Sequence, residues 1–386
     1  MKAQSVYIHI PFCQQICHYC DFTKFFYDEQ SADEYIEALK HEVNTAIDGE
    51  KNSVETIFIG GGTPTALTFQ QLKSLMQLID TKFDIAGTVE FSIEANPGDF
   101  DGEKAKLLNS YGVNRVSLGV QVFDNAMLEQ LGRIHEVKDV YHTVELLKKN
   151  HFYNISLDLI YALPNQTLDH FRQTLNEAVA FDLPHYSAYA LQIEPKTIFY
   201  QRYKKGTLHR PPEEEEVSMY ELLKDTMRKN GLNHYEISNF AKHGFESRHN
   251  LTYWNNQHYY GFGAGAHGYL SGVRMGNIRP LPQYVQQAKE TGKPVLHTEE
   301  ISKREMIEEE MFLGLRKMEG INKEQFKAKY GFPYDDLYGD VINALTQKGW
   351  IEDSGKQLRL TDEGMLFGNE VFAQFLLEEH DLNLVR

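Results

Sequence analysis

The chain is poor in cysteine, and the few thiols that it has are gathered in one place. Its 386 residues include only three cysteines, and Cys13, Cys17 and Cys20 lie within eight positions of one another. An odd number of thiols cannot be fully paired within one chain, and such short spacings would strain a bridge between neighbours. The sequence therefore argues against a disulfide framework and for a group of thiols that acts together.

The chain also lacks a long apolar run and an excess of basic charge. No segment approaches the roughly 18 apolar residues of a membrane span, and no charged and then apolar leader opens the sequence. We therefore expect a protein of the reducing cytoplasm, which visits the inner face of the membrane only transiently if its partner lies there. The net charge of −16 disfavours nucleic acid or an anionic lipid surface as the main partner.

Clustered thiols in a reducing compartment usually hold metal, and two kinds of site compete here. A structural zinc site needs about four protein ligands, and His18 is the one further candidate inside the loop. Its place between Cys17 and Cys20 makes shared coordination awkward. A cubane iron–sulfur cluster can be held by thiolates on three of its irons, which leaves the fourth iron for a small molecule. The spacing favours the cluster over zinc, with inert thiols as a third alternative.

Short segments with strand composition alternate with segments of helical periodicity along the first half of the chain. The expected strands are residues 5–10, 54–60, 89–95, 114–120, 154–160 and 186–192, and the expected helices are 33–47, 68–79, 102–111, 125–131, 137–149 and 168–181. Right-handed βαβ units in series build a parallel sheet. The sequence predicts an α/β fold with a partial (β/α)6 barrel, whose functional residues lie at the C-terminal strand ends.

Polar residues and glycines mark several of these strand ends. The segment FIGGGTPT contains three glycines before Thr63, which would let backbone approach a ligand and leave N–H groups free to bind it. A plain turn explains this segment equally well. Glu94, Gln121 and Asp158 mark the next three strands. A buried acid needs a partner, so a shared ligand at the barrel mouth is favoured over separate helix caps and loop hydrogen bonds.

Together, the CxxxCxxC loop and the blocks YIHIPFC, GGGTPT, SLGVQ and DLIYALPNQT resemble the radical S-adenosylmethionine (radical SAM) superfamily over essentially the whole chain. The similarity is greatest to the branch that contains oxygen-independent coproporphyrinogen III oxidases and a group of heme chaperones. The resemblance implies a [4Fe-4S] cluster, S-adenosylmethionine chelated to its unique iron, and an electron donor such as a flavodoxin or ferredoxin. It also implies S-adenosylmethionine contacts at Tyr7, Gly62, Thr63, Glu94, Gln121, Arg133 and Asp158.

Two departures separate this chain from the oxidase pattern. The oxidases have a fourth cysteine where this chain has Phe22, and they have a longer segment before the cluster loop. Both differences weaken the interpretation as a decarboxylase. The block HNLTYW resembles a block of the heme-chaperone group, and it contains His249, Asn250, Tyr253 and Trp254.

Heme is therefore the further ligand that the resemblance implies, and the HNLTYW block is its candidate region. An imidazole can ligate heme iron, and Tyr and Trp rings can cover a porphyrin face. Taken alone, His249 is more often a hydrogen-bonded structural histidine than an axial ligand. His267, in the glycine-rich segment that follows, is a competing imidazole.

The pattern changes after about residue 302. Helical segments are expected at 304–317, 323–330 and 335–348, followed by a two-stranded wing around Ser354 and Gly355. This order predicts a small winged-helix-like domain. Its acidic EEEMF run and the absence of a basic stripe argue against DNA binding. We expect a barrel core over 1–235, a heme-associated connecting region over 236–300 and the C-terminal domain over 301–386. Earlier, the run PPEEEEV is expected to start a helix.

The sequence thus predicts a heme-binding protein that carries a cluster and S-adenosylmethionine and delivers heme to an acceptor hemoprotein, for which a respiratory protein is a candidate. The main alternative is a radical coproporphyrinogen III decarboxylase. A weaker one is a radical methyltransferase or another porphyrin-modifying enzyme. No residue is assigned a catalytic role.

Overall fold

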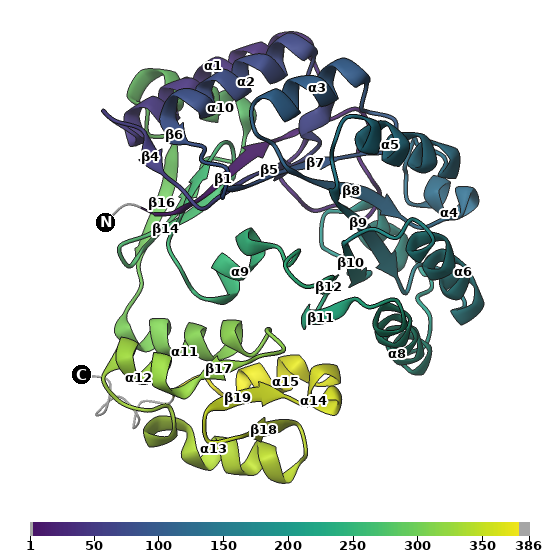
Figure 1. Ribbon diagram of the computed structural model, residues 1–386, viewed down its shortest axis with the longest axis vertical. Coiled ribbons are helices and arrows are strands. Elements are labelled where there is room, and N and C mark those ends of the chain that lie inside the picture. Colours follow the sequence, from purple (N-terminus) through teal and green to yellow (C-terminus); the bar gives the residue numbers. More distant parts are fainter. Residues whose placement is uncertain (1–2, 378–386) are drawn as a thin grey trace.

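A mixed sheet of twelve strands runs through the larger part of the protein. The computed structural model describes residues 3–377. The sheet curves around a central space, with helices on its outer side and a smaller unit below it (Figure 1). The strand order is β11-β12-β10-β9-β8-β7-β5-β1-β13-β14-β15-β16.

The six predicted strands form the parallel centre of this sheet. They are β1 Ser5–Ile10, β5 Thr56–Gly61, β7 Glu90–Ala95, β8 Arg115–Gln121, β9 Asn154–Tyr161 and β10 His185–Ala190. Every neighbouring pair among them is parallel. This parallel arrangement confirms the prediction of a partial (β/α)6 barrel. Its strands are largely apolar on both faces, and they are buried between the outer helices and a filled interior.

The predicted helices cover the outer side of the barrel. They are α1 Glu29–Ala46, α2 Phe69–Lys82, α3 Gly102–Ser110, α4 Asn125–Gln130, α5 Val137–Lys149 and α6 Leu168–Val179. Local side chains fix where they start. Asp28, Asp101 and Asp124 accept hydrogen bonds from backbone N–H groups of the first turn, and Thr68 forms a full capping box. Such caps satisfy N–H groups that the helix itself cannot pair.

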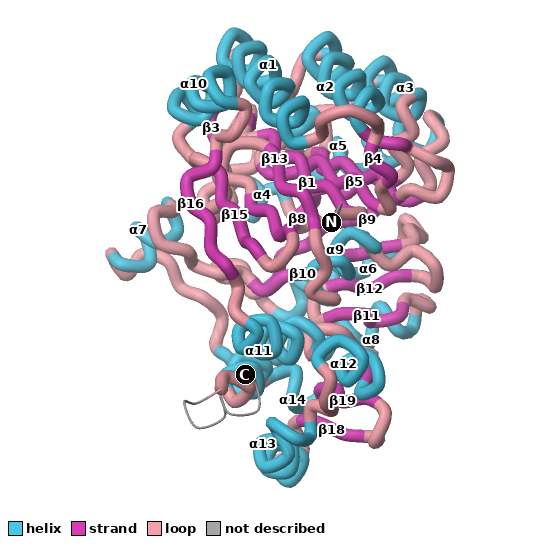
Figure 2. The backbone as a smooth tube through the Cα atoms, turned by 90° about the vertical axis from the view of Figure 1, so that its left-hand side faces the viewer, coloured by secondary structure: helices cyan, strands magenta, loops and turns pink. Residues whose placement is uncertain are grey.

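The sheet extends further than the sequence predicted. Beyond β10 lies an antiparallel hairpin of β11 Asn233–Glu236 and β12 Asn239–Ala241. Beyond β1 lie β13 Tyr259–Phe262, β14 His267–Leu270, β15 Val273–Asn277 and β16 Val295–Glu300. The segment 236–300, expected to be a heme-associated connecting region, therefore supplies strands of the main sheet. The tube view shows β13 beside β1, with β15 and β16 farther out (Figure 2).

Further helices complete the larger part. They are α7 Ile198–Lys204, α8 Glu213–Lys229, α9 Arg248–Trp254 and α10 Leu281–Thr291. The expected helix start at PPEEEEV is confirmed, since Pro212 is the N-cap of α8 and four glutamates form its first turn. Helix α9 lies on the concave side of the sheet (Figure 1). Two minor strand pairs join β2 Phe12–Cys13 to β3 Phe25–Phe26 and β4 Asn52–Ser53 to β6 Phe83–Asp84.

The C-terminal unit has its own core. Its helices are α11 Lys303–Gly314, α12 Lys323–Tyr330, α13 Asp335–Gln347, α14 Asp362–Leu366 and α15 Gly368–Ala373, with strands β17 Ile321–Asn322, β18 Ile351–Asp353 and β19 Gln357–Leu360. The predicted wing is present, because β18 and β19 are antiparallel around Ser354 and Gly355. A separate group of buried side chains between Ile307 and Leu377 stabilises the unit. The expected domain boundaries themselves stay predictions.

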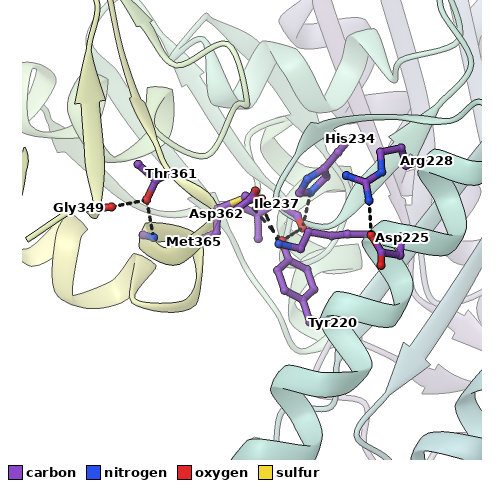
Figure 3. A network of polar contacts seen from close by, with 11 residues as sticks. Tyr220, Asp225, Arg228, His234, Ile237, Gly349, Thr361, Asp362 and Met365 are labelled. Atoms are coloured by element: carbon purple, nitrogen blue, oxygen red, sulfur yellow. Dashed lines mark hydrogen bonds and ion pairs between the residues drawn. The ribbon is translucent and has the colours of Figure 1, made fainter.

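Polar contacts join the C-terminal unit to the barrel. The Tyr220 hydroxyl donates to the Ile237 carbonyl at 3.1 Å and to the Met365 sulfur at 3.8 Å (Figure 3). Lys224 Nζ lies 3.7 Å from a carboxylate oxygen of Asp362. Within residues 3–377, no helix is both long enough and apolar enough to cross a membrane.

Candidate functional site

The three cysteines lie on a loop that is tied to the barrel at several points. The Tyr27 N–H donates to the Cys13 carbonyl at 2.9 Å, which closes the loop. His9 of β1 anchors its far side, because His9 Nε2 lies 2.7 Å from the Thr23 carbonyl oxygen. All three thiols are free and line one cavity of about 580 Å³. The loop thus presents its sulfur atoms to a single space.

The donor set fits a cluster better than a zinc ion. His18 does not complete a site with the thiols, because its Nδ1 lies 2.8 Å from the Gln130 carbonyl oxygen. Within residues 3–377, no three His, Cys, Asp or Glu side chains are grouped to hold one metal ion. A cubane cluster needs no such convergence, since each thiolate binds a different iron. Burial raises the pKa of the Cys13 thiol to about 11, so bound metal would have to stabilise its thiolate.

The glycine-rich end of β5 packs directly against the cysteine loop. A Cβ atom on Gly62 would lie 2.8 Å from the Phe12 carbonyl oxygen and 3.0 Å from Cys13 Sγ. Gly61 has a φ of +115°, which other residues rarely adopt. The glycines are therefore required for close packing at the cluster loop.

The expectation that this segment offers free N–H groups is wrong for Gly61, Gly62 and Thr63. The Gly61 N–H donates to Glu94 Oε2 at 2.8 Å, the Gly62 N–H to the Ile10 carbonyl at 2.9 Å and the Thr63 N–H to the Phe12 carbonyl at 2.7 Å. Strand register brings these acceptors within reach of the turn. A 3-10 helix, η1 Pro64–Ala66, follows and carries the chain away from the mouth.

Glu94, Gln121 and Asp158 line the same cavity as the cysteines, as their strand positions predict. Burial raises the pKa of the Glu94 carboxyl to about 7; the Gly61 hydrogen bond opposes the rise and the Asp158 charge adds to it. Burial also raises the pKa of Asp158, against the effect of Ser117, whose hydroxyl donates to Asp158 at 2.8 Å. Two neighbouring acids in a closed space favour a cationic or hydroxyl-bearing ligand.

Gln121 reaches the mouth through an irregularity in the sheet. The pairing of β8 with β9 shifts register between Gly119 and Gln121, and Gln121 has a φ of +69°. Such bulges redirect a side chain and often lie next to binding sites. From this bulge Gln121 lines the cavity, where its side chain can contact a ligand.

Arg133 connects the strand ends to the cluster loop. Its guanidinium donates to Asn96 Oδ1 at 2.6 Å and to Cys17 Sγ at 3.4 Å. Asn96 in turn donates to Thr63 Oγ1 at 2.9 Å, and Thr63 contacts Cys13 Sγ at 3.7 Å. Sequence reasoning missed Asn96, although its place two residues after Glu94 at the same strand end was a usable signal.

Tyr7, another expected contact, does not line the cavity. Its hydroxyl lies 2.9 Å from His9 Nδ1, and its ring stacks on Phe58 at a centroid distance of 6.2 Å. Tyr7 thus supports His9, which holds the cluster loop through Thr23. His9 was also missed, and the signal was a polar residue inside the apolar segment of β1.

The HNLTYW block forms α9, and most of its side chains have partners inside the protein. His249 is 1% exposed, with Nδ1 at 2.8 Å from Thr56 Oγ1 and Nε2 at 2.8 Å from the Tyr253 hydroxyl. Burial lowers the pKa of His249 to about 3. The Arg316 guanidinium lies 4.5 Å from the centre of the Trp254 ring. Of the four expected residues, Asn250 alone lines the cavity, so the arrangement favours a structural role for His249.

Comparisons with known proteins agree with this architecture. Residues 7–178 match the family model of the Radical SAM superfamily, and residues 301–367 match that of the HemN C-terminal domain. A solved structure of the coproporphyrinogen III oxidase HemN from Escherichia coli has a TM-score of 0.85 and 22% identity, covering 97% of this chain and 90% of that one. At that identity the likeness shows the fold alone.

Two curated relatives are much closer in sequence. The heme chaperone HemW of Bacillus subtilis (strain 168) is 50% identical, with 97% of this chain and all of that protein aligned. The heme chaperone HemW of Lactococcus lactis subsp. lactis (strain IL1403) is 45% identical, with 98% of each chain aligned. Similarity of this extent over both full lengths, on a radical SAM barrel, identifies the chain as a member of the HemW family within the radical SAM superfamily.

Proposed function

We propose that the protein is a heme chaperone that carries a [4Fe-4S] cluster and S-adenosylmethionine and passes heme to an acceptor hemoprotein in the cytoplasm or at its membrane boundary. The observation that carries this proposal is 50% identity over the full length of a protein named heme chaperone HemW. Membership of the radical SAM superfamily implies the cluster and S-adenosylmethionine.

The cysteine loop is the proposed cluster site. Cys13, Cys17 and Cys20 would each bind one iron, and the cluster would supply single electrons received from a flavodoxin or ferredoxin. The chain's own residues keep this loop in place: Arg133 donates toward Cys17, and His9 holds the Thr23 carbonyl. Thr63 holds the part of the loop that contains Cys13, because its hydroxyl lies 3.7 Å from Cys13 Sγ.

S-adenosylmethionine is proposed to bind in the cavity beside the cysteines. Glu94 and Asp158 are acceptors for its amine and ribose hydroxyls, and Gln121 faces the same space. Gly62 allows the close approach of backbone there, and Tyr7 acts from outside the cavity through His9. Arg133 and Thr63 orient the cluster side of the ligand.

Heme is proposed to bind beside α9, with His267 as the imidazole for its iron. Unlike His249, His267 is exposed and has no hydrogen bond among the described residues; its ring centre lies 6.0 Å from that of His297. Helix α9 contacts the neighbouring strands, because the ring of Tyr253 of α9 lies 4.7 Å from that of Tyr259 of β13, and β13 pairs with β14, the strand of His267. Tyrosine rings and an exposed imidazole suit a porphyrin.

The test is heme titration of anaerobically reconstituted protein, followed by transfer to an apo-hemoprotein. We expect binding by the wild type and a changed absorption band for His267→Ala, with His41→Ala, which alters another exposed histidine on α1, as the matched control. An unchanged band in His267→Ala would remove that ligand. Absence of heme uptake by cluster-loaded wild type would overturn the chaperone function.

The competing function, oxidative decarboxylation of coproporphyrinogen III, is tested on the same samples. Phe22 stands where the resemblance places the fourth cysteine of the oxidases. Its side chain has no sulfur atom to offer, and it is 60% exposed. We expect no decarboxylated product when S-adenosylmethionine and a reductant are added. Chromatographic detection of that product would favour the enzyme over the chaperone.

A further inference from the structure

A buried arginine lies at the end of the cavity far from the strand tips. Arg115 is 2% exposed and lines the same cavity as the three cysteines. It begins β8, whereas Gln121 ends that strand, and at about 3.3 Å per residue the two positions are roughly 20 Å apart. The cavity therefore extends from the cysteine loop deep into the barrel.

The guanidinium of Arg115 is only partly satisfied. Nη1 donates to Asn154 Oδ1 at 3.0 Å and to the Phe245 carbonyl at 3.2 Å, while Nε and Nη2 have no partner among residues 3–377. The charge of Arg115 acts on Asp158 across the cavity, but no carboxylate of those residues lies within ion-pair distance of the guanidinium, and Ser117 donates to Asp158 instead. Arginine stays protonated, so burying it without a counter-ion in contact is costly.

Its surroundings supply more donors and no negative charge in direct contact. The side chain of Asn250, on α9, also lines the cavity and has no hydrogen-bond partner in the described part of the chain. Ser92 is the register neighbour of Arg115 on β7, and its buried hydroxyl is likewise unpaired within those residues. A free Nε–Nη2 edge is the side of a guanidinium that binds a carboxylate in a bidentate manner.

We propose that Arg115 and Asn250 form a subsite for the carboxylate of an organic ligand that occupies the cavity. The proposal rests on the proposed function, which supplies a carboxylate-bearing ligand for this end of the cavity: a porphyrin with its propionates. The amino-acid end of S-adenosylmethionine is expected at the cluster instead. The HNLTYW block takes part through Asn250, the residue that faces the cavity. A bound carboxylate would neutralise the buried guanidinium.

The test compares two probes that differ only in the acid, iron mesoporphyrin and its dimethyl ester, in one detergent buffer. S-adenosylmethionine is measured beside them, because its amino-acid end is expected at the cluster and not at Arg115. The reconstituted full chain is measured as wild type, Arg115→Gln and Arg115→Lys. The matched control is Arg248→Gln, because Arg248 is an exposed arginine of α9 that donates to the Thr88 carbonyl.

Arg115→Gln should bind iron mesoporphyrin at least tenfold more weakly, bind the dimethyl ester unchanged and bind S-adenosylmethionine as the wild type does. Arg115→Lys should be intermediate and Arg248→Gln unchanged. Equal losses for both porphyrins, no loss for either, or a loss confined to S-adenosylmethionine would overturn the subsite.

Two further measurements keep the test decisive. If melting curves show that Arg115→Gln does not fold, Asn250→Ala replaces it, with an expected loss of about threefold confined to the acid-bearing probe; no selective loss overturns the proposal. If the wild type binds neither porphyrin, the heme function fails and the subsite fails with it; wild-type binding with no selective loss in Arg115→Gln overturns the subsite alone.

Discussion

The barrel mouth and helix α9 contain equally suggestive residues, yet the structure treats them differently. At the mouth, three thiols and the side chains of Glu94 and Asp158 face one cavity. In α9, both ring nitrogens of His249 already have protein partners. The difference teaches that a reactive residue type indicates a site only where its polar atoms remain available to a ligand.

The largest expected effect concerns the cluster at the mouth. Cys17→Ala should abolish the cluster, because two thiolates cannot replace a tripod on three irons. Anaerobic reconstitution with iron analysis and absorption spectra measures this, with about four irons per chain expected for the wild type. His18→Ala is the matched control and should keep the cluster, because His18 is bound to the Gln130 carbonyl. An intact cubane spectrum in Cys17→Ala would contradict the assignment.

The next effect should be on stability and should come from α9. His249→Ala leaves Thr56 and Tyr253 without their buried partner, and we expect a loss of about 2–4 kcal/mol in the free energy of unfolding. Denaturant melts measure it, with His243→Ala, at an exposed loop position, as the control. Heme bound to the variant should keep its native absorption band. A shifted band with unchanged stability would make His249 an iron ligand and remove the contrast between the two regions.

A smaller effect is expected on cofactor affinity at the mouth. Asp158→Ala should weaken S-adenosylmethionine binding by roughly 1–3 kcal/mol, the cost of removing one partner from a buried polar contact. Cluster content should not change, since no thiol contacts Asp158. Calorimetry of the reconstituted variant beside Asp169→Ala, which alters an exposed acid on α6, is the measurement. Equal affinities in all three proteins would take Asp158 out of the site.

The smallest effect is a pH dependence from Glu94. Its pKa is raised from 4.5 to about 7, so between these values the folded protein binds more protons than the unfolded chain. The contribution of Glu94 to stability is therefore greatest below about pH 4.5 and declines as pH rises through 7. A cationic ligand prefers the ionised carboxylate, so its affinity should rise over the same window. Glu94→Gln should flatten both profiles, and identical profiles for variant and wild type would show that Glu94 does not titrate there.

The barrel could be predicted because its signals are local. Strands such as β1 and β9 are largely apolar segments of strand-forming residues, and each expected helix has its own periodicity and capping residue. The strand-end rule then placed Glu94, Gln121 and Asp158 around one cavity without knowledge of any contact. The additional strands β13 and β14 were missed, because each has only four residues and contains glycine.

The sequence by itself determined the thiol loop, the alternation of strands and helices, and the family, because these depend on residue types at short spacings. Only the tertiary structure decided which polar groups remain open. His249 meets Thr56, 193 positions away, and Asn277 meets Glu42, 235 positions away. Arg115 forms no ion pair with a carboxylate among the described residues, although its charge acts on Asp158. Whether a side chain is satisfied depends on neighbours that only the folded chain brings together, since hydrogen bonds act over about 3 Å and not along the sequence.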